Sequence, residues 1–209
     1  DLSYEYCHDR RTADRGVPAD GDEPIRGFTR TFFGDPGKSF ARANVNLATF
    51  AAEHEFGEGL TLKNRTMFGD YAKFYQNIFP ASFNATAGAV ALQAYNNRND
   101  RRTLFSQTDL IWESRLAGID QTLLFGFEVG REKSRNFRNT GSFPDGNIVP
   151  ISDPTVDANV VFAPIRSDAN NRVKADVAAA YVQDQIRPAA WLEIVAGLAP
   201  KPDAPTSIR

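Results

Sequence analysis

The sequence predicts an all-β protein with a curved antiparallel sheet, and three observations support this fold class. Apolar and polar residues alternate at every second position in several stretches, whereas no stretch shows the helical period of about 3.6 residues. Residues that favour strands and turns are frequent, with 16 Phe, 6 Tyr and 2 Trp beside 15 Gly and 12 Pro. The connections between the alternating stretches are either short or long, and the short ones join neighbouring stretches into hairpins.

The first hairpin is predicted around the Gly-containing segment 56–59. Apolar residues alternate with polar ones over residues 43–55, and the alternation resumes over residues 60–74 after the turn. Such a pair of alternating runs around a short turn is the signature of a β-hairpin. Residues 2–7 also alternate, so we expect a further strand near the first residue of the sequence.

Two more hairpins are predicted further along the chain. Their strands cover residues 103–113 and 121–132, joined by 114–119, and residues 173–186 and 191–198, joined by 187–190. In the last hairpin the apolar face is ambiguous, because Val182 and Ile186 compete with Val177 and Tyr181 for the same side.

The lengths of the connections distinguish two β architectures. The long connections are polar and cover roughly residues 8–41, 75–100 and 133–172. Loops this long are uncommon in compact soluble domains, where the median is about 4–6 residues. Transmembrane β-barrels combine short periplasmic turns with long extracellular loops. The pattern therefore favours a partial transmembrane β-barrel of about seven strands, while a soluble β-sandwich, whose inward faces alternate in the same way, stays open as the alternative.

The barrel interpretation predicts a specific topology. The three short connections should lie at one end of the sheet, and residues near 20, 85 and 150 at the other. One face should carry the apolar side chains of Leu60, Leu62, Phe68, Leu104, Leu110, Leu123, Phe125 and Phe127. The opposite face should carry Lys63, Arg65, Asp109, Glu113, Glu128 and Glu132.

Charge balance and residue usage exclude several functional classes. The chain has 24 Lys+Arg against 26 Asp+Glu, so its net charge supports no nucleic-acid partner. The single cysteine, Cys7, excludes an intrachain disulfide or a Cys-cluster metal site, and His8 and His54 match no ligand spacing. Neither histidine has a motif that would build a nucleophilic triad. The sequence therefore predicts neither an enzyme nor a metal or cofactor bound by the protein itself.

Several segments together resemble one known family. They are DRGVP (14–18), FFGDP (32–36), EHEFGEGLTLKNRT (53–66), GDYAKFYQNIFP (69–80), NNRNDRR (96–102), NFRNTG (136–141) and AYVQDQI (180–186). In this order and spacing they resemble the barrel of TonB-dependent siderophore receptors of the bacterial outer membrane, near the ferric-catecholate branch. The resemblance covers about residues 2–198.

The resemblance implies an outer-membrane transporter, not an enzyme, that binds and imports ferric siderophores. Iron would arrive only as the ferric siderophore, and the partners would be this chelate, outer-membrane lipid, and the TonB-ExbB-ExbD complex acting through a plug domain. The plug, the TonB box and the later strands of the family have no counterpart here. We therefore expect residues 1–198 to form a partial barrel of a longer protein, open at two edges, and residues 199–209 to be a Pro-rich tail outside the family pattern.

Aromatic and arginine residues near the long loops are the candidate ligand contacts. An aromatic, anionic ferric catecholate suits flat rings and guanidinium groups, since Arg supplies charge and stacking together. A role in the aromatic girdle at the membrane interface is the alternative for these rings, and Arg26, Arg30 and Arg102 lie nearby in sequence. The candidates are Phe32, Phe33, Phe74, Tyr75, Phe79, Phe83, Tyr95, Arg98 and Arg101.

Overall fold

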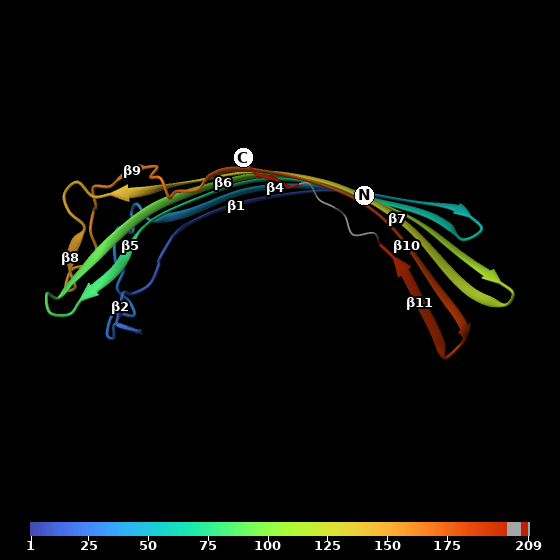
Figure 1. Ribbon diagram of the computed structural model, residues 1–209, viewed down its shortest axis with the longest axis horizontal. Coiled ribbons are helices and arrows are strands. Elements are labelled where there is room, and N and C mark those ends of the chain that lie inside the picture. Colours follow the sequence, from blue (N-terminus) through green and yellow to red (C-terminus); the bar gives the residue numbers. More distant parts are fainter. Residues whose placement is uncertain (200–205, 209) are drawn as a thin grey trace.

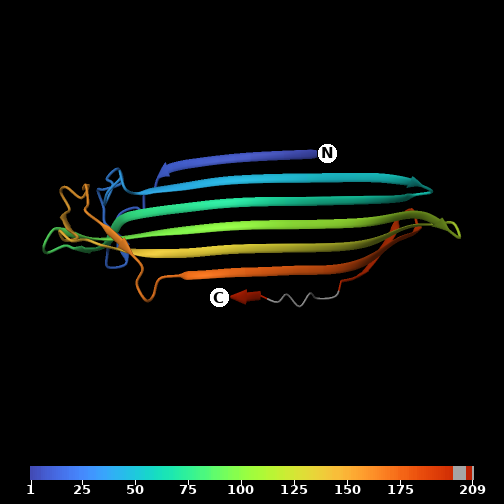
Figure 2. The same cartoon turned by 90° about the horizontal axis from the view of Figure 1, so that it is seen from above.

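The computed structural model describes residues 1–199 and 206–208, and one large antiparallel sheet dominates it. Seven strands follow one another across the sheet in the order β1-β4-β5-β6-β7-β10-β11, as Figure 2 shows. This confirms the predicted fold class. The strands are β1 (Leu2–Thr12), β4 (Phe40–Gly57), β5 (Leu60–Asn84), β6 (Ala89–Leu116), β7 (Ile119–Ser142), β10 (Asn170–Ala189) and β11 (Leu192–Leu198).

Five short strands complete the structure. In the connection before β4, β2 (Ala19–Asp20) and β3 (Glu23–Pro24) form a separate two-stranded sheet. Three others extend the large sheet: β8 (Ile148–Pro150) pairs with β6, β9 (Val161–Ala163) with β7, and β12 (Thr206–Ile208) with β10. Most of the expected Pro-rich tail, residues 200–205 and 209, lies outside the described residues, and no helix in the described part is long and apolar enough to cross a membrane.

The strands bend along their length, so the sheet forms an arch (Figure 1). The turns after β4, β6 and β10 lie at one end, and the three remaining connections lie at the other, as predicted. Two of the turns use consecutive left-handed residues, Glu58 and Gly59 (φ 51° and 76°) and Ala117 and Gly118 (φ 52° and 83°). Positive φ at both central positions is the geometry of a type I′ hairpin turn, whose twist matches that of the flanking strands.

The expectation of a long loop over residues 75–100 is wrong. β5 continues to Asn84 and β6 begins at Ala89, so only residues 85–88 connect them. The two strands stay paired through the whole interval, up to Asn84 opposite Ala89. The polar residues of this interval suggested a loop, but backbone pairing between β5 and β6 holds them in strands. The long loops that remain cover residues 13–39 and 143–169.

The strand register confirms the predicted division of side chains between two faces. Leu62, Leu110 and Phe125 are cross-strand neighbours, and Lys63 lies opposite Asp109 on the other side. We call the first side the outer face and the second the inner face. Val182 lies opposite Phe125, so β10 turns Val182 and Ile186 outward and Val177 and Tyr181 inward, which resolves the ambiguity in the sequence. All the residues in the two predicted sets follow this division.

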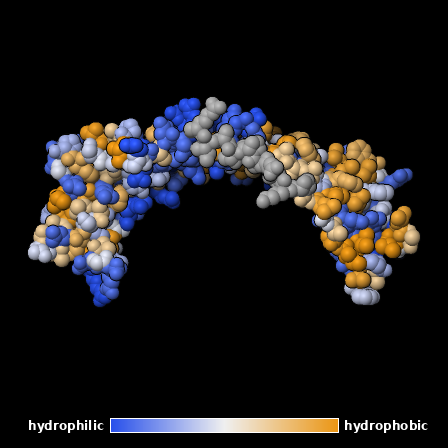
Figure 3. Space-filling model, viewed as in Figure 1, coloured by the Kyte–Doolittle hydropathy of each residue, from blue (hydrophilic) through white to orange (hydrophobic). Residues whose placement is uncertain are grey.

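Large apolar side chains stay exposed on the outer face near the short turns. Phe68, Leu104, Phe125 and Phe127 are 44–51% exposed. A soluble sandwich would bury this face under a second sheet, whereas a lipid-facing barrel wall leaves it uncovered. Figure 3 shows hydrophobic residues over the limb of the arch that ends in β11, and hydrophilic residues over its middle.

Three aromatic rings on the inner face lie across glycines. The Tyr181 ring covers Gly126, where an added Cβ would come within 1.9 Å of it, and the Tyr71 ring similarly covers Gly69. The Phe105 ring lies over Gly130 at 3.0 Å from the same hypothetical atom. These glycines give the rings room to lie flat, Tyr71 along its own strand and Tyr181 and Phe105 over the neighbouring strand β7.

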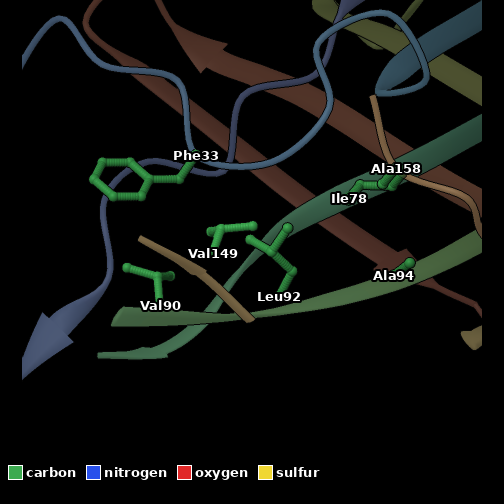
Figure 4. Close-up of a cluster of buried hydrophobic side chains, with 7 residues drawn as sticks. All are labelled: Phe33, Ile78, Val90, Leu92, Ala94, Val149 and Ala158. Atoms are coloured by element: carbon green, nitrogen blue, oxygen red, sulfur yellow. The ribbon is translucent and has the colours of Figure 1, made fainter. Parts of the chain in front are cut away.

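A small hydrophobic core lies at the long-loop end of the arch. Figure 4 shows Phe33, Val90, Leu92 and Val149 gathered there, and each of them is at most 8% exposed. The loop before β4 docks onto β5 because Gly34, at φ +116°, approaches the Ile78 carbonyl so closely that an added Cβ would lie 2.0 Å from its oxygen. This core fixes parts of the two long loops against the ends of β5 and β6.

Candidate ligand-binding site

Three aromatic residues meet on the inner face at the long-loop end. Tyr75 and Phe79 come from β5 and are an even number of positions apart, so they share a face, and Tyr95 comes from neighbouring β6. The ring centroids of Tyr75 and Tyr95 are 5.8 Å apart, and those of Phe79 and Tyr95 are 5.5 Å apart. Both pairs meet edge to face, the arrangement that aligns a positive ring edge with a negative ring face.

Two guanidinium groups join these rings. The Arg138 Cζ atom, from β7, lies 4.0 Å from the Tyr95 ring centroid. The Arg15 Cζ atom, from the loop after β1, lies 5.4 Å from the Phe79 centroid and 5.8 Å from that of Tyr95. We refer to Arg15, Tyr75, Phe79, Tyr95 and Arg138 as the aromatic–arginine cluster. It presents positive charge and flat aromatic surface side by side.

A buried carboxylate orients Arg138. The Asp168 side chain is 5% exposed, and its Oδ1 lies 3.6 Å from Arg138 Nε. Asp168 also accepts hydrogen bonds from Thr140 N, Thr140 Oγ1 and Ile165 N at 2.9–3.0 Å. Burial acts to raise the pKa of Asp168, but these hydrogen bonds and the Arg138 charge outweigh it, so the pKa is lowered from its ordinary value. The carboxylate is therefore ionised at neutral pH and holds the arginine in place.

Ligand-accessible space lies beside the cluster. Tyr75 is 37% exposed and the Arg138 side chain 44% exposed, so both reach solvent. A cavity of about 260 Å³ borders Tyr95, Arg138 and Thr140. Sites for a whole drug-sized ligand are commonly about 300–1,000 Å³, so this hollow is the size of one part of a ligand.

A second cation–aromatic pair lies further along the inner face toward the short turns. Arg101 Cζ is 4.7 Å from the Tyr71 centroid, and Arg101 Nη1 is 3.9 Å from Glu132 Oε2. The Arg101 Nε is buried and has no hydrogen-bond acceptor among the residues that the structure describes. Arg101 thus shares the face of the aromatic–arginine cluster without touching its rings.

The structure brings together only part of the predicted residue set. Tyr75, Phe79 and Tyr95 form the cluster, and Arg101 lies on the same face. Phe33 is 1% exposed and Phe83 packs against the same core, so neither side chain joins the aromatic–arginine cluster. Phe32 is half-buried, and its carbonyl accepts a hydrogen bond from Thr155 Oγ1.

Two other predicted residues lie on the outer face, opposite the aromatic–arginine cluster. Phe74 is one position from Tyr75 and therefore points outward, where its ring packs 5.6 Å from that of Phe40. Arg98 also points outward and pairs with Asp100 at 2.8 Å. Phe74 thus fits the alternative role of a girdle residue.

Three residues of the site were missed in the sequence. Arg138 could have been found, because it lies in the NFRNTG segment and strand periodicity places it on the face of Glu132. Arg15 and Asp168 lie in the long loops, where no periodicity relates them to the strands. Within the residues that the structure describes, no group of three or more His, Cys, Asp or Glu side chains could hold a metal ion.

Comparisons with known proteins agree with this architecture. The family model described as TonB dependent receptor-like, β-barrel, matches residues 1–199. The siderophore receptor PiuA of Acinetobacter baumannii superposes with a TM-score of 0.70 at 14% identity, over 99% of this chain and 36% of the receptor. The open form of the ferric-catecholate import receptor Fiu of E. coli K12 gives 0.74 at 17% identity, over 99% of this chain and 40% of the receptor.

A third receptor has the same fold. BauA, the ferric preacinetobactin receptor of Acinetobacter baumannii, gives a TM-score of 0.60 at 11% identity, over 99% of this chain and 33% of its own. The chain thus spans 33–40% of the length of these three receptors. No curated protein matches the sequence.

Proposed function

The chain belongs to the TonB-dependent receptor-like β-barrel family, and from this premise we propose that it forms part of the wall and the extracellular ligand site of a ferric siderophore importer. The protein would lie in the bacterial outer membrane, with the short turns in the periplasm and the long loops outside. It would act as a transporter without enzymatic chemistry or a cofactor of its own. Energy would come from the TonB-ExbB-ExbD complex, and iron would enter only as the chelate.

The aromatic–arginine cluster is the observation that carries this proposal. A ferric catecholate is an anion with flat aromatic surfaces, and it would be matched by the rings of Tyr75, Phe79 and Tyr95 and the charges of Arg15 and Arg138. The cluster lies on the inner face beside the long loops, where a ligand from outside would enter a barrel. The structural similarity to Fiu, a ferric-catecholate import receptor, supports the catecholate class.

A soluble binding module is less well supported. Its outer face would have to be buried, yet the side chains of Leu104 and Phe127 on that face are each 51% exposed. Exposed apolar surfaces of this kind are found where a protein meets lipid or another protein.

Substitution of Arg138 tests the proposed site. In the protein with all the flanking sequence that its gene encodes, Arg138→Gln should weaken binding of a ferric catecholate about tenfold, as expected for a lost cation contact. The measurement is quenching of tryptophan fluorescence in the purified receptor, together with uptake of radioactive iron by cells. Arg115→Gln is the matched control, because Arg115 makes an ion pair of 3.4 Å with Asp120 at the opposite end of the sheet. Unchanged binding of every ferric catecholate tested would remove the support for this site.

A further inference from the structure

Asn77 lies among the rings of the aromatic–arginine cluster. It is on β5 between Tyr75 and Phe79, and the residue opposite it in register on β6 is Tyr95. Residues two positions apart on a strand share a face, and so do residues opposite one another in register. The three rings of the cluster therefore flank the Asn77 side chain on three sides.

The Asn77 amide has an unused hydrogen-bond donor. Asn77 is 2% exposed, and its buried Nδ2 atom has no acceptor among the residues that the structure describes. A buried donor without a partner destabilises a folded protein, and the large majority of buried polar side-chain atoms have one. In a protein that binds a ligand, such a donor is explained by an acceptor that the ligand supplies.

Burial at this end of the sheet does not by itself leave an amide unpaired. Asn96 is adjacent to Tyr95 on β6 and therefore points to the outer face, where it is 7% exposed. Its Nδ2 donates a hydrogen bond to Gln76 Oε1 at 3.4 Å, and its Oδ1 accepts one from Asn139 Nδ2 at 3.1 Å. The unpaired donor is thus a feature of the side that carries the aromatic–arginine cluster.

The groups around the Asn77 donor include two that can move aside. Tyr75 is partly exposed and touches Tyr95 only edge to face. Arg15 is an exposed loop residue, and its contacts with the Phe79 and Tyr95 rings are of the cation–aromatic kind, which are weak at exposed sites. Exposed side chains change rotamer within nanoseconds, so a ligand that packs against the rings can gain access to the donor.

We propose that Asn77 is a further ligand-binding residue of this site, and that its Nδ2 donates a hydrogen bond to an iron-bound phenolate oxygen of the ferric catecholate. These oxygens lie at the edge of each catechol ring, so a ring packed among the aromatic side chains can direct an oxygen toward Asn77. A hydrogen bond to a charged acceptor is roughly twice as strong as a neutral one. A site built around such a bond rejects ligands that lack the acceptor. The inference rests on the proposed function and assigns the ligand oxygens a specific partner.

The test compares Asn77→Leu with Asn96→Leu in the protein with all its flanking sequence, purified in detergent. Leu has nearly the shape of Asn but no donor. N77L should bind the ferric tris(catecholate) trianion roughly 10- to 100-fold more weakly in isothermal titration calorimetry, because it loses a hydrogen bond to a charged oxygen. The same variant should raise the urea midpoint of unfolding by about 0.3 M, since it removes an unpaired buried donor.

The control variant should behave in the opposite way. N96L should bind the trianion as the wild type does and should lower the urea midpoint, because it leaves Gln76 and Asn139 without their hydrogen-bond partner. Weaker binding together with higher stability identifies a ligand contact, since loss of a purely structural residue would lower stability.

Two results for N77L would overturn the inference. One is affinity equal to that of the wild type. The other is a lowered urea midpoint or a failure to fold, which would show that the amide already has a partner. A wild-type protein that binds no ferric catecholate would overturn the proposed function, and this inference with it.

Discussion

The contact between Tyr181 and Gly126 makes a quantitative prediction about stability. A Cβ at Gly126 would lie 1.9 Å from Tyr181 Cζ and 2.0 Å from its Cε2, so Gly126→Ala must displace the ring. The Tyr181 hydroxyl donates a hydrogen bond of 2.5 Å to Asp109 Oδ1 and accepts one of 2.7 Å from Gln107 Nε2. Displacement of the ring therefore breaks a hydrogen-bond network that connects β6 and β10 across β7.

The expected loss is large for a single methyl group. Overpacking costs about 1–3 kcal/mol and loss of a hydrogen bond to a charged acceptor about 1.5–3 kcal/mol, so Gly126→Ala should lower the free energy of unfolding by about 3–5 kcal/mol. Tyr181→Phe keeps the ring in place and should lose only the hydrogen-bond part, about 1.5–3 kcal/mol. The measurement is urea unfolding of the purified protein in detergent micelles, followed by tryptophan fluorescence.

A double-mutant cycle isolates the clash. Once Tyr181→Ala has removed the ring, the added methyl group meets open space, and Gly126→Ala should cost less than about 0.5 kcal/mol more. If Gly126→Ala costs the same with and without the Tyr181 ring, the ring contact does not explain the need for glycine, and the reasoning is refuted.

Three further predictions follow from the loops, the buried carboxylate and the outer face. Because the pKa of Asp168 is lowered by folding, its contribution to holding Arg138 is fully present above its unfolded pKa of about 3.9 and is lost as the pH falls through the lower folded value. Ferric catecholate binding should thus fall in acid below about pH 4, and Asp168→Asn should weaken binding at neutral pH and remove that Asp168 transition. Gly34→Ala combines a left-handed φ of +116° with a 2.0 Å approach to the Ile78 oxygen, so it should release the 13–39 loop and speed its cleavage by protease, whereas Gly27→Ala, with nothing within 4 Å, should not. The protein should partition into detergent and associate in plain buffer, because Phe125 and Phe127 are 48% and 51% exposed; a monodisperse monomer without detergent would contradict the lipid-facing assignment.

Strand periodicity predicted much of the sheet, but little of the structure at the end that carries the long loops. A side chain such as Leu62 or Phe125 is placed on a face by its position alone, so the division into two faces and the common end of the short turns followed from alternation. The strands through Asn77 and Asn97 were mistaken for a loop, because polar residues such as these interrupt the alternation of apolar and polar side chains there. Pairing in the sheet, and not hydropathy, holds that region in strands.

The site was only partly predictable for a related reason. Tyr75, Phe79 and Tyr95 were recognised as candidates by residue type. Phe74 was included with them, although it is next to Tyr75 on the same strand and therefore points to the opposite face. Burial of Phe33 depends on the docking of a loop through Gly34, which no local pattern reports. Arg15 reaches Phe79 from far along the chain, and contacts of that kind appear only once the fold is known.

The rings that lie over glycines also shape the surface of the inner face. Tyr71, Phe105 and Tyr181 are among the largest side chains on that face, yet their rings lie flat over a glycine instead of standing upright. At these three positions the inner wall is therefore flat and presents aromatic ring faces. A domain that lay against this wall would meet the flat faces of three rings there, and no upright side chain at the three glycines.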